Sequence, residues 1–264
     1  MPNPLAGHTN SYHTYGHDDA LRGIAAAGYR YVELTAVPGW TEHVDLGTPP
    51  AEVRRALEAY GLEAVSLSAH SDLTTRDGLE HGIRAVRWAA DYGLPIVNTA
   101  VGGHQSADEN EAAFLGNVGR LADAAESAGV VVALEIHGDI MASSDVTIPL
   151  LERVGRESIK VNYDTGNVEF YGGMRAVDDL PKIAPYLAHV HLKDTAGGRG
   201  NWNFPALGDG VVDFAEVLAI LGRAGYRGPY SVELEFQGEP WPPLEEVDDA
   251  MRRSHEHLTA LGLS

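Results

Sequence analysis

The sequence contains no cysteine, and this absence removes several kinds of chemistry. Without a thiol the chain forms no disulfide, carries no thiolate nucleophile and builds no metal site with sulfur ligands. The absence is also typical of proteins in the reducing cytoplasm, where disulfides are rare. We therefore expect a cytoplasmic protein whose chemistry depends on oxygen and nitrogen atoms.

Long apolar runs are missing as well. No stretch reaches the eighteen apolar residues that a membrane-spanning helix needs. The segment 1–15 is polar and lacks the basic start and apolar middle of a secretory signal peptide. Hydrophobic residues still make up 44% of the 264 positions, which is enough for one large core. We expect a single domain over residues 1–264 with no membrane partner.

Basic residues are scarce, with 19 Lys and Arg against 38 Asp and Glu and a formal charge of −19. A protein that binds duplex nucleic acid needs a Lys- and Arg-rich face to displace counterions from the phosphates. The sequence shows no such stripe, so we expect no nucleic-acid partner. Most of the acidity is typical of a solvated surface, and only the positions of a few carboxylates are informative.

Short apolar runs alternate with longer stretches of helical periodicity throughout the chain. The predicted strands lie near Pro4–Thr9 and at Tyr31–Leu34, Glu63–Leu67, Ile96–Thr99, Val130–Ile136, Ile159–Tyr163, Ala188–Leu192 and Tyr230–Leu234. The predicted helices are His17–Ala27, Pro50–Tyr60, Arg76–Tyr92, Asp108–Ala128, Ser144–Val154, Met174–Ile183, Asp213–Ala224 and Leu244–Leu261.

A glycine follows several of these helices, at positions 28, 61, 93, 129 and 225, where a left-handed residue commonly ends a helix. Strict alternation of helices with strands that are apolar on both faces predicts a parallel sheet. Eight such units over this length favour a closed (β/α)8 barrel, the TIM barrel, over an open doubly wound sheet.

Enzymes with this barrel carry their chemistry at the carboxyl ends of the strands, so the polar residues there are the candidate site. Among the earlier strands, Glu33 lies at the end of the second, His70 follows the third and Asn98 lies on the fourth. On the later strands the polar residues are Glu135 on the fifth, Asp164 on the sixth, His189, His191 and Lys193 on one face of the seventh, and Glu233 and Glu235 on the eighth.

Four neighbouring strands therefore offer Glu135, Asp164, His191 and Glu233 to the same mouth. Each of these residues alone is more often a cap or an ion-pair partner than a ligand. Together, three carboxylates and one imidazole suit Mn²⁺, Mg²⁺ or Co²⁺. Buried carboxylates are costly to keep ionised, and a divalent cation removes that cost.

These motifs resemble a known family along nearly the whole chain. The segments are GYRYVEL on the second strand, LEIHGD on the fifth, YDTGNVEFYGG on the sixth, HVHLKD on the seventh and LGDGVVDFAEVL before the eighth. The chain resembles the sugar isomerase/epimerase superfamily with xylose-isomerase-like barrels. That superfamily includes ketose 3-epimerases, hydroxypyruvate isomerases and inosose dehydratases, and more distantly apurinic endonucleases.

The resemblance implies one divalent metal held by Glu135, Asp164, His191 and Glu233, with Mn²⁺ as the first expectation and Mg²⁺, Co²⁺ or Zn²⁺ as alternatives. The ligand is the second histidine of the H-x-H pair, His191 rather than His189, and Glu235 is the fallback for Glu233. Asn167 stands where the epimerases commonly have a histidine that touches substrate, which departs from the ketose 3-epimerase pattern.

The resemblance also implies an isomerase or epimerase that acts on a small carbohydrate. Glu135 and Glu233 are expected as the acid/base pair that moves a proton beside the carbonyl. Lys193 is expected either to hold a substrate oxygen or to form an ion pair with Glu233 or Asp164, and both alternatives stay open.

The remaining predictions concern substrate contacts. We expect His70, Asn98, His137 and Asn167 to contact substrate, together with Arg199 and Trp202 in the long loop after the seventh strand. That loop, which also contains Phe204, reads either as a lid or as a loop packed on the barrel top. Trp40 and Trp241 are candidates for an apolar wall. No glycine-rich helix start with basic support is present, which favours an unphosphorylated substrate.

Three other functions remain open. A dehydratase or lyase would use the same site with His137 as an additional acid, as the likeness to inosose dehydratases allows. A repair nuclease would need a basic groove, which the charge disfavours, and a non-catalytic barrel would not need all four ligands. The sequence does not fix the oligomeric state, and a homo-oligomer is one alternative.

Overall fold

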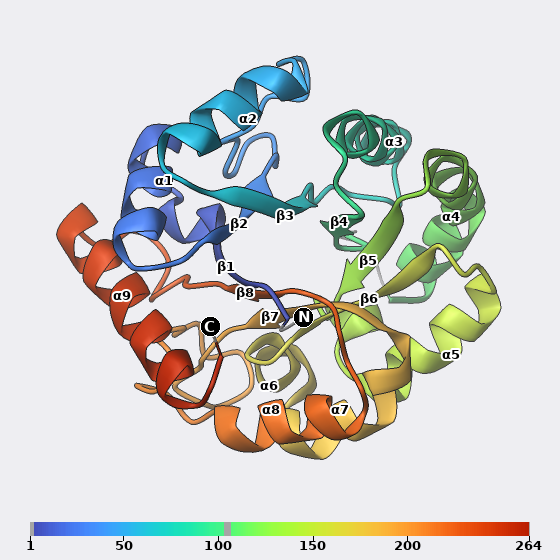
Figure 1. Ribbon diagram of the computed structural model, residues 1–264. Coiled ribbons are helices and arrows are strands. Elements are labelled where there is room, and N and C mark those ends of the chain that lie inside the picture. The colour runs from blue at the N-terminus through green and yellow to red at the C-terminus, as the bar shows by residue number, and fades with distance from the viewer. Residues whose placement is uncertain (1–2, 103–106, 264) are drawn as a thin grey trace.

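The computed structural model describes residues 3–102 and 107–263. In this part of the chain eight parallel strands pair in sequence order and close on themselves, so the predicted TIM barrel is confirmed (Figure 1). The strands are β1 Leu5–His8, β2 Tyr31–Thr35, β3 Glu63–Ser68, β4 Ile96–Thr99, β5 Val131–Glu135, β6 Ile159–Asp164, β7 Leu187–Leu192 and β8 Tyr230–Val232.

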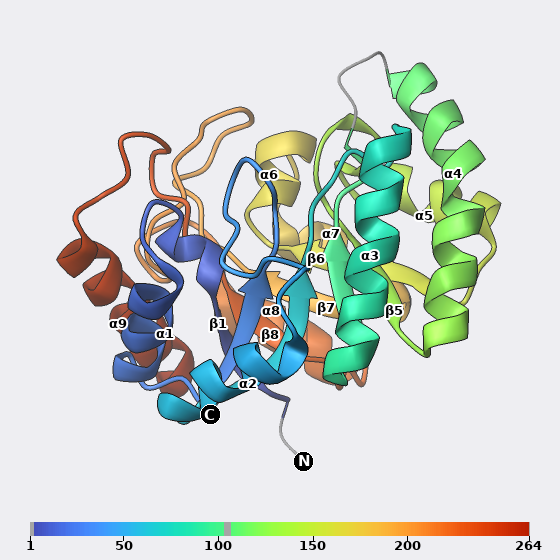
Figure 2. The same ribbon diagram turned by 90° about the horizontal axis from the view of Figure 1, so that it is seen from above.

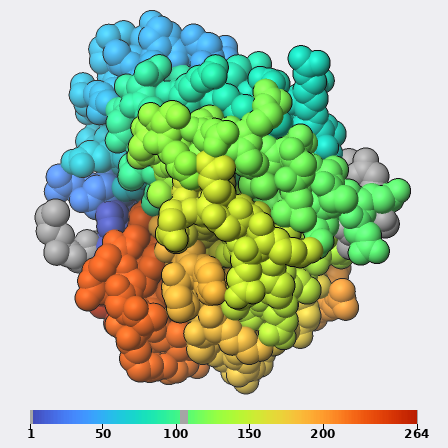
Figure 3. Space-filling model, turned by 90° about the vertical axis from the view of Figure 1, so that its right-hand side faces the viewer, coloured from blue at the N-terminus to red at the C-terminus, as the bar shows by residue number. Residues whose placement is uncertain are grey.

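Helices surround the strands on the outside of the barrel. They are α1 His17–Ala26, α2 Pro50–Ala59, α3 Arg76–Tyr92, α4 Ala107–Ala128, α5 Ser144–Val154, α6 Asn167–Gly172, α7 Ala176–Ile183, α8 Phe214–Arg223 and α9 Leu244–Ala260. Short 3-10 turns lie at Thr9–Tyr12, Asp139–Met141 and Ala184–Tyr186. In the space-filling view the green to yellow segments, which include α4 and α5, cover one side of the barrel with a continuous surface (Figure 3). Among the residues described, no helix combines the length and hydrophobicity that crossing a bilayer requires.

The strands alternate between an apolar and a polar face, which corrects the expectation that both faces are apolar. Outward residues such as Val32, Leu34 and Val161 belong to the buried hydrophobic core beneath the helices. Inward residues instead hydrogen-bond across the barrel, as Ser66 on β3 does with His189 on β7 at 3.2 Å. The centre of the barrel is therefore a buried polar layer, and it lies below the mouth where the candidate ligands end their strands.

Helix α6 was not predicted, and it lies over the carboxyl ends of the strands (Figure 2). It begins directly after β6 because the Oδ1 atom of Asp164 accepts the backbone N–H groups of Gly166 (2.9 Å) and Asn167 (2.7 Å). Gly173 ends it with a φ of +65°, so α7 starts two residues later than the predicted Met174. Six residues are too few to show helical periodicity in a sequence.

The long loop between β7 and α8 is anchored by one buried carboxylate. Asp194 Oδ2 accepts the N–H groups of Gly208 (2.8 Å) and Gly210 (2.9 Å). Its Oδ1 accepts those of Thr195 (2.9 Å) and Val212 (3.1 Å). The first and last parts of the loop are thus tied to the same side chain, which fixes the base of the segment predicted as a lid.

Asp194→Asn should destabilise the protein because the amide offers one acceptor oxygen and turns an N–H₂ group towards backbone donors. We expect a loss of roughly 2–4 kcal/mol in the free energy of unfolding, since hydrogen bonds to a charged group and unpaired buried donors each cost on this scale. Urea unfolding measures it. The exposed Asp178 at the start of α7 gives the matched control, and Asp178→Asn should change stability by less than about 0.5 kcal/mol. Equal stability of the two variants would contradict the anchoring role.

Candidate active site

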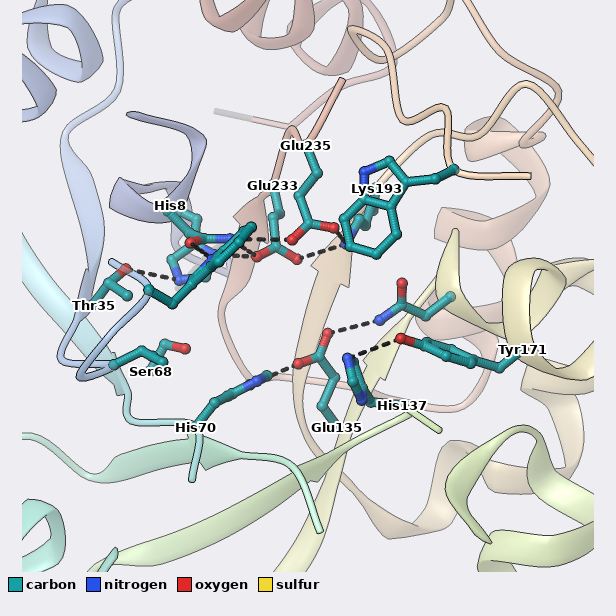
Figure 4. Close-up of a pocket in the computed structure, with 15 residues that line it drawn as sticks. His8, Thr35, Ser68, His70, Glu135, His137, Tyr171, Lys193, Glu233 and Glu235 are labelled. Atoms are coloured by element: carbon teal, nitrogen blue, oxygen red, sulfur yellow. Dashed lines mark hydrogen bonds and ion pairs between the residues drawn. The ribbon is translucent and has the colours of Figure 1, made fainter. Parts of the chain in front are cut away.

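A polar pocket opens at the carboxyl ends of the strands, and we call it the inner pocket (Figure 4). Its volume is about 260 Å³. It is lined by His8, Asn10, Thr35, Val37, Trp40, Ser68, His70, Glu135, His137, Asn167, Tyr171, Lys193, Trp202, Glu233 and Glu235. Side chains from strands on opposite sides of the barrel therefore face one small space.

Glu135 and Glu233 from the pocket lining and the fully buried Asp164 and His191 beside them each offer one ligand atom within 4.8 Å of the others. We call these four residues the acidic cluster. His191 Nδ1 lies 3.3 Å from Glu233 Oε2, 3.4 Å from Glu135 Oε1 and 3.8 Å from Asp164 Oδ2. The structure thus brings together the four residues that the sequence suggested as ligands.

The acidic cluster fits a divalent cation. Asp164 Oδ2 and His191 Nδ1 are buried and form no hydrogen bond with the described residues, although buried polar atoms normally have a partner. Burial raises the pKa of Asp164 well above its usual range, and Glu135 and Glu233 add to this rise, which Lys193 and His191 only partly oppose. Three carboxylates so close together need positive charge to stay ionised, and an oxygen-rich set with one nitrogen suits a hard cation.

Glu33 orients the histidine of the cluster from below. Its Oε2 atom lies 3.0 Å from His191 Nε2, and both side chains are fully buried. Asn98 donates to Glu33 Oε1 at 2.5 Å. Despite burial, the pKa of Glu33 is held well below its usual range by His191, His8 and His189. A carboxylate at Nε2 favours the tautomer with the proton on that nitrogen, which leaves the Nδ1 lone pair facing the cluster.

Three residues predicted to touch substrate line one wall of the inner pocket. His70 Nε2 lies 2.7 Å from Glu135 Oε2, and Asn167 donates to Glu135 Oε1 at 3.1 Å. Burial opposes a charge on His70, but Glu135 outweighs it and raises the His70 pKa. His137 pairs with the Tyr171 hydroxyl at 2.9 Å, and burial lowers its pKa to about 4.

Lys193 lies on the opposite wall with Glu233 and Glu235, which directly follow β8. Its ammonium is 2.5 Å from Glu235 Oε2 and 3.3 Å from Glu233 Oε2, and 4.4 Å from the centre of the Phe204 ring. Burial opposes its charge, but Glu233 and Glu235 outweigh burial and raise the Lys193 pKa well above its usual range. Lys193 therefore stays a cation. Lys193 pairs with Glu235 and with Glu233 of the acidic cluster, and its ammonium lies 3.7 Å from Asp164 Oδ2, so the predicted ion pair with Glu233 or Asp164 is present.

Asn98 and Trp241 do not line the inner pocket. Asn98 points into the polar layer below it, because the buried Glu33 carboxylate takes its amide as a hydrogen-bond donor. Trp241 is 8% exposed, and its indole N–H donates to the Ser11 carbonyl at 3.0 Å. The apolar wall expected from two tryptophans is thus provided by Trp40 without Trp241.

Arg199 also lies away from the inner pocket, on the exposed surface of the β7–α8 loop. The backbone explains this placement, since the N–H of Gly200 donates to the Phe170 carbonyl at 2.9 Å and ties the loop to α6. Trp202 from the same loop does reach the pocket, with its ring edge-on to Phe170 and to Phe204.

Sequence reasoning missed several lining residues. His8 Nδ1 lies 3.0 Å from Glu233 Oε1, and Asn10 donates to the same oxygen at 2.9 Å. His8 lies within the predicted first strand near its carboxyl end, and Asn10 follows that strand, so the strand end was the available signal. Thr35 and Ser68 also face the pocket, and the two-residue alternation from Glu33 and from Ser66 could have found them. Tyr171 belongs to α6, which had no sequence signal.

Known proteins resemble the chain in both sequence and fold. An L-ribulose 3-epimerase of Methylomonas sp. (strain DH-1) is 29% identical over 239 residues, which cover 83% of this chain and 78% of that protein. The L-ribulose-5-phosphate 3-epimerase UlaE of Salmonella paratyphi C (strain RKS4594) is 30% identical over 183 residues, which cover 68% of this chain and 63% of UlaE.

The fold comparison agrees with this likeness. The crystal structure of a D-allulose 3-epimerase from Methylomonas sp. in complex with D-allulose superposes with a TM-score of 0.76. The identity is 24%, and the match covers 98% of this chain and 97% of that one. The family model described as "Xylose isomerase-like TIM barrel" matches residues 21–260. The chain therefore belongs to the xylose isomerase-like TIM barrel family, in which its relatives include sugar 3-epimerases.

Proposed function

We propose that the protein is a divalent-metal-dependent epimerase or isomerase that moves the proton on the carbon beside the carbonyl of a small keto sugar. The observation that carries this proposal is the acidic cluster, which opens into a polar pocket with carboxylates on two sides (Figure 4). The sugar epimerases among the relatives support the same substrate class.

Glu135, Asp164, His191 and Glu233 would hold the cation, with Mn²⁺ as the first candidate and Mg²⁺, Co²⁺ or Zn²⁺ as alternatives. When bound, a divalent cation polarises a ketone and its neighbouring hydroxyl and so acidifies the proton between them. Asp164 Oδ2 and His191 Nδ1 are buried and form no hydrogen bond with the described residues, and this supports the ligand set.

Glu135 and Glu233 would serve as the acid/base pair. They come from β5 and from the end of β8, and their carboxylates approach the pocket from opposite sides (Figure 4). The pKa of each is lowered despite burial, by His70 and His191 at Glu135 and by Lys193 and His191 at Glu233, so each is an ionised base. One carboxylate takes the substrate proton on its side. The other carboxylate, after taking up a proton from solvent, donates that proton to the opposite face of the same carbon, which inverts the centre, and the first then releases its proton to solvent.

The other lining residues would position the sugar. His70, His137, Asn167 and Trp202 remain the proposed substrate contacts from the sequence, and Lys193 would hold a substrate oxygen at the other wall. Lys193 is the single Lys or Arg among the described lining residues, and Glu233 and Glu235 already neutralise it. A phosphate group would find no free cation here, which supports an unphosphorylated substrate.

The dehydratase or lyase alternative receives less support from the site. It requires an additional acid, for which His137 was the candidate. Burial lowers the pKa of His137 to about 4, so its imidazole is neutral near pH 7 and poorly suited to donate a proton. We therefore favour proton exchange without loss of a hydroxyl group.

The metal site is tested through Glu33, which touches no proposed substrate atom. Glu33→Gln removes the charge behind His191 Nε2 and should weaken Mn²⁺ binding about 10–100-fold, as loss of a residue supporting a metal ligand typically does. Isothermal titration calorimetry of the metal-free protein measures the Kd. The exposed pair of Glu63 with Arg30 gives the control, and Glu63→Gln should leave the Kd unchanged. The same Kd in Glu33→Gln and wild type would refute the orienting role.

The acid/base assignment is tested by Glu135→Gln and Glu233→Gln, assayed at saturating Mn²⁺ on a panel of free ketoses. Each change keeps the side-chain size but removes the base, so kcat should fall at least about 100-fold. Incorporation of solvent deuterium at the carbon beside the carbonyl should be lost or slowed in parallel. The exposed Glu239 provides the control, since Glu239→Gln should keep wild-type turnover. Wild-type rates in both pocket variants would mean that other residues supply the acid and base.

The contribution of the β7–α8 loop to substrate binding is tested by Trp202→Ala. Trp202 is 37% exposed and lines the pocket, so its loss should raise KM roughly 3–10-fold while Tm changes little. Leu261→Ala is the matched control and should leave KM unchanged, because Leu261 is similarly exposed, at 39%, but lies near the end of α9 and outside the pocket lining. An unchanged KM in Trp202→Ala would show that the loop is simply packed on the barrel top.

A further inference from the structure

A second and larger cavity adjoins the inner pocket, and we call it the outer chamber. Its volume is about 920 Å³, against about 260 Å³ for the inner pocket. Five residues line both spaces: Val37, Trp40, His70, His137 and Tyr171. The outer chamber continues over the segments that follow β2, β3, β4 and β5, on the side away from Lys193 and Glu235. Among the described residues its further lining includes Ser71, Asp72, Gly138, Asp139 and Ile140.

The two volumes indicate a substrate longer than one sugar. Clefts that bury most of a small ligand measure roughly 300–1,000 Å³. The inner pocket lies just below this range, so a single keto sugar bound at the acidic cluster uses its space and leaves the outer chamber empty. The chamber shares His70 with the inner pocket, and His70 in turn lies 2.7 Å from Glu135. Any group in the chamber is thus close enough to be attached to the reacting sugar.

The lining chemistry indicates a neutral, hydroxylated ring. Trp40, which is 42% exposed, and Tyr171 provide aromatic surface, and Val37 and Ile140 add apolar contacts. Asp139 and the Oδ2 atom of Asp72, whose Oδ1 already accepts hydrogen bonds from Thr74, provide carboxylate acceptors for hydroxyl groups. Asp139 is exposed and has no hydrogen bond or ion pair with the described residues, so its oxygens are available.

Charge excludes the other obvious occupants. The described lining of the chamber contains two carboxylates but no Lys or Arg. A phosphate, a nucleotide or a sugar acid would meet these two carboxylates, and the histidine that could carry compensating charge, His70, is already paired with Glu135 at 2.7 Å, so anion binding costs energy. A sugar ring has an apolar C–H face for the aromatic side chains and hydroxyl donors for the carboxylates, and so matches both parts of the lining.

We propose that the outer chamber is a binding subsite for a second, uncharged sugar unit, joined by a glycosidic bond to the keto sugar in the inner pocket. The preferred substrate is then a glycosylated ketose, such as a keto-disaccharide, instead of a free ketose. This inference rests on the proposed function for the position of the reacting unit.

The experiment compares binding of D-fructose with that of fructose carrying one hexose at O4 or O6, by calorimetry on the Mn²⁺-loaded protein. Wild type should bind at least one disaccharide about tenfold more tightly than the free ketose. In Asp139→Trp the indole should occupy the chamber, and the change breaks no hydrogen bond or ion pair with the described residues. This variant should lose the tighter binding of the disaccharide, while its Kd for fructose stays within about twofold of wild type. Asp178→Trp, at an exposed site outside both cavities, should behave as wild type.

Turnover is scored separately, by exchange of the substrate proton with solvent deuterium. If no ketose exchanges its proton but the disaccharide advantage and its loss in Asp139→Trp are both seen, the outer subsite stands and the proposed reaction fails. If disaccharides bind no more tightly than fructose, or Asp139→Trp keeps their advantage, the outer subsite is refuted whatever the turnover.

Discussion

Carboxylates held in the dry centre of the barrel are the constraint on which the rest of the site depends. Glu33, Glu135, Asp164 and Glu233 are all nearly or fully buried, and ionised groups in such surroundings need nearby compensation. Below the mouth this comes from His191, His189 and Asn98 around Glu33. At the mouth the neighbouring side chains do not give every oxygen a hydrogen bond, since Asp164 Oδ2 has ion-pair neighbours but no hydrogen bond with the described residues. Electrostatic repulsion between these buried carboxylates favours the binding of a cation at the mouth.

The two proposed acid/base residues have different surroundings although both are glutamates. Glu135 is flanked by His70 and Asn167, whereas Glu233 is flanked by His8, Asn10 and Lys193. A permanent cation therefore supports only one wall of the pocket, and a histidine supports the other. Such asymmetry is the usual way in which two carboxyl groups acquire separate roles in proton transfer. The outer chamber lies on the histidine side, so a substituent on the sugar would leave the pocket past His70 and His137.

The family relationship limits the chemistry more than the substrate. The two sequence relatives differ in whether the substrate in their names carries a phosphate, and the match covers only 63% of the UlaE protein. In this chain the one Lys or Arg in the described pocket lining is already paired with glutamates. This is a feature of the walls around the cluster, which are expected to differ when one barrel serves several substrates.

The sequence by itself determined the barrel and the candidate cluster, because both follow from local patterns. Short apolar runs that alternate with glycine-terminated helices predict the eight units, and residues at strand ends must meet at one mouth of a parallel barrel. Only the tertiary structure decided which polar residues reach the pocket. Asn98 hydrogen-bonds to Glu33 below the pocket, and Arg199 lies on the surface of a loop that is tied to α6. His8 and Tyr171, which are far apart in the chain, both line the pocket. Loop anchoring and the hydrogen-bond partners that buried carboxylates require set these positions, and both depend on contacts between residues distant in sequence.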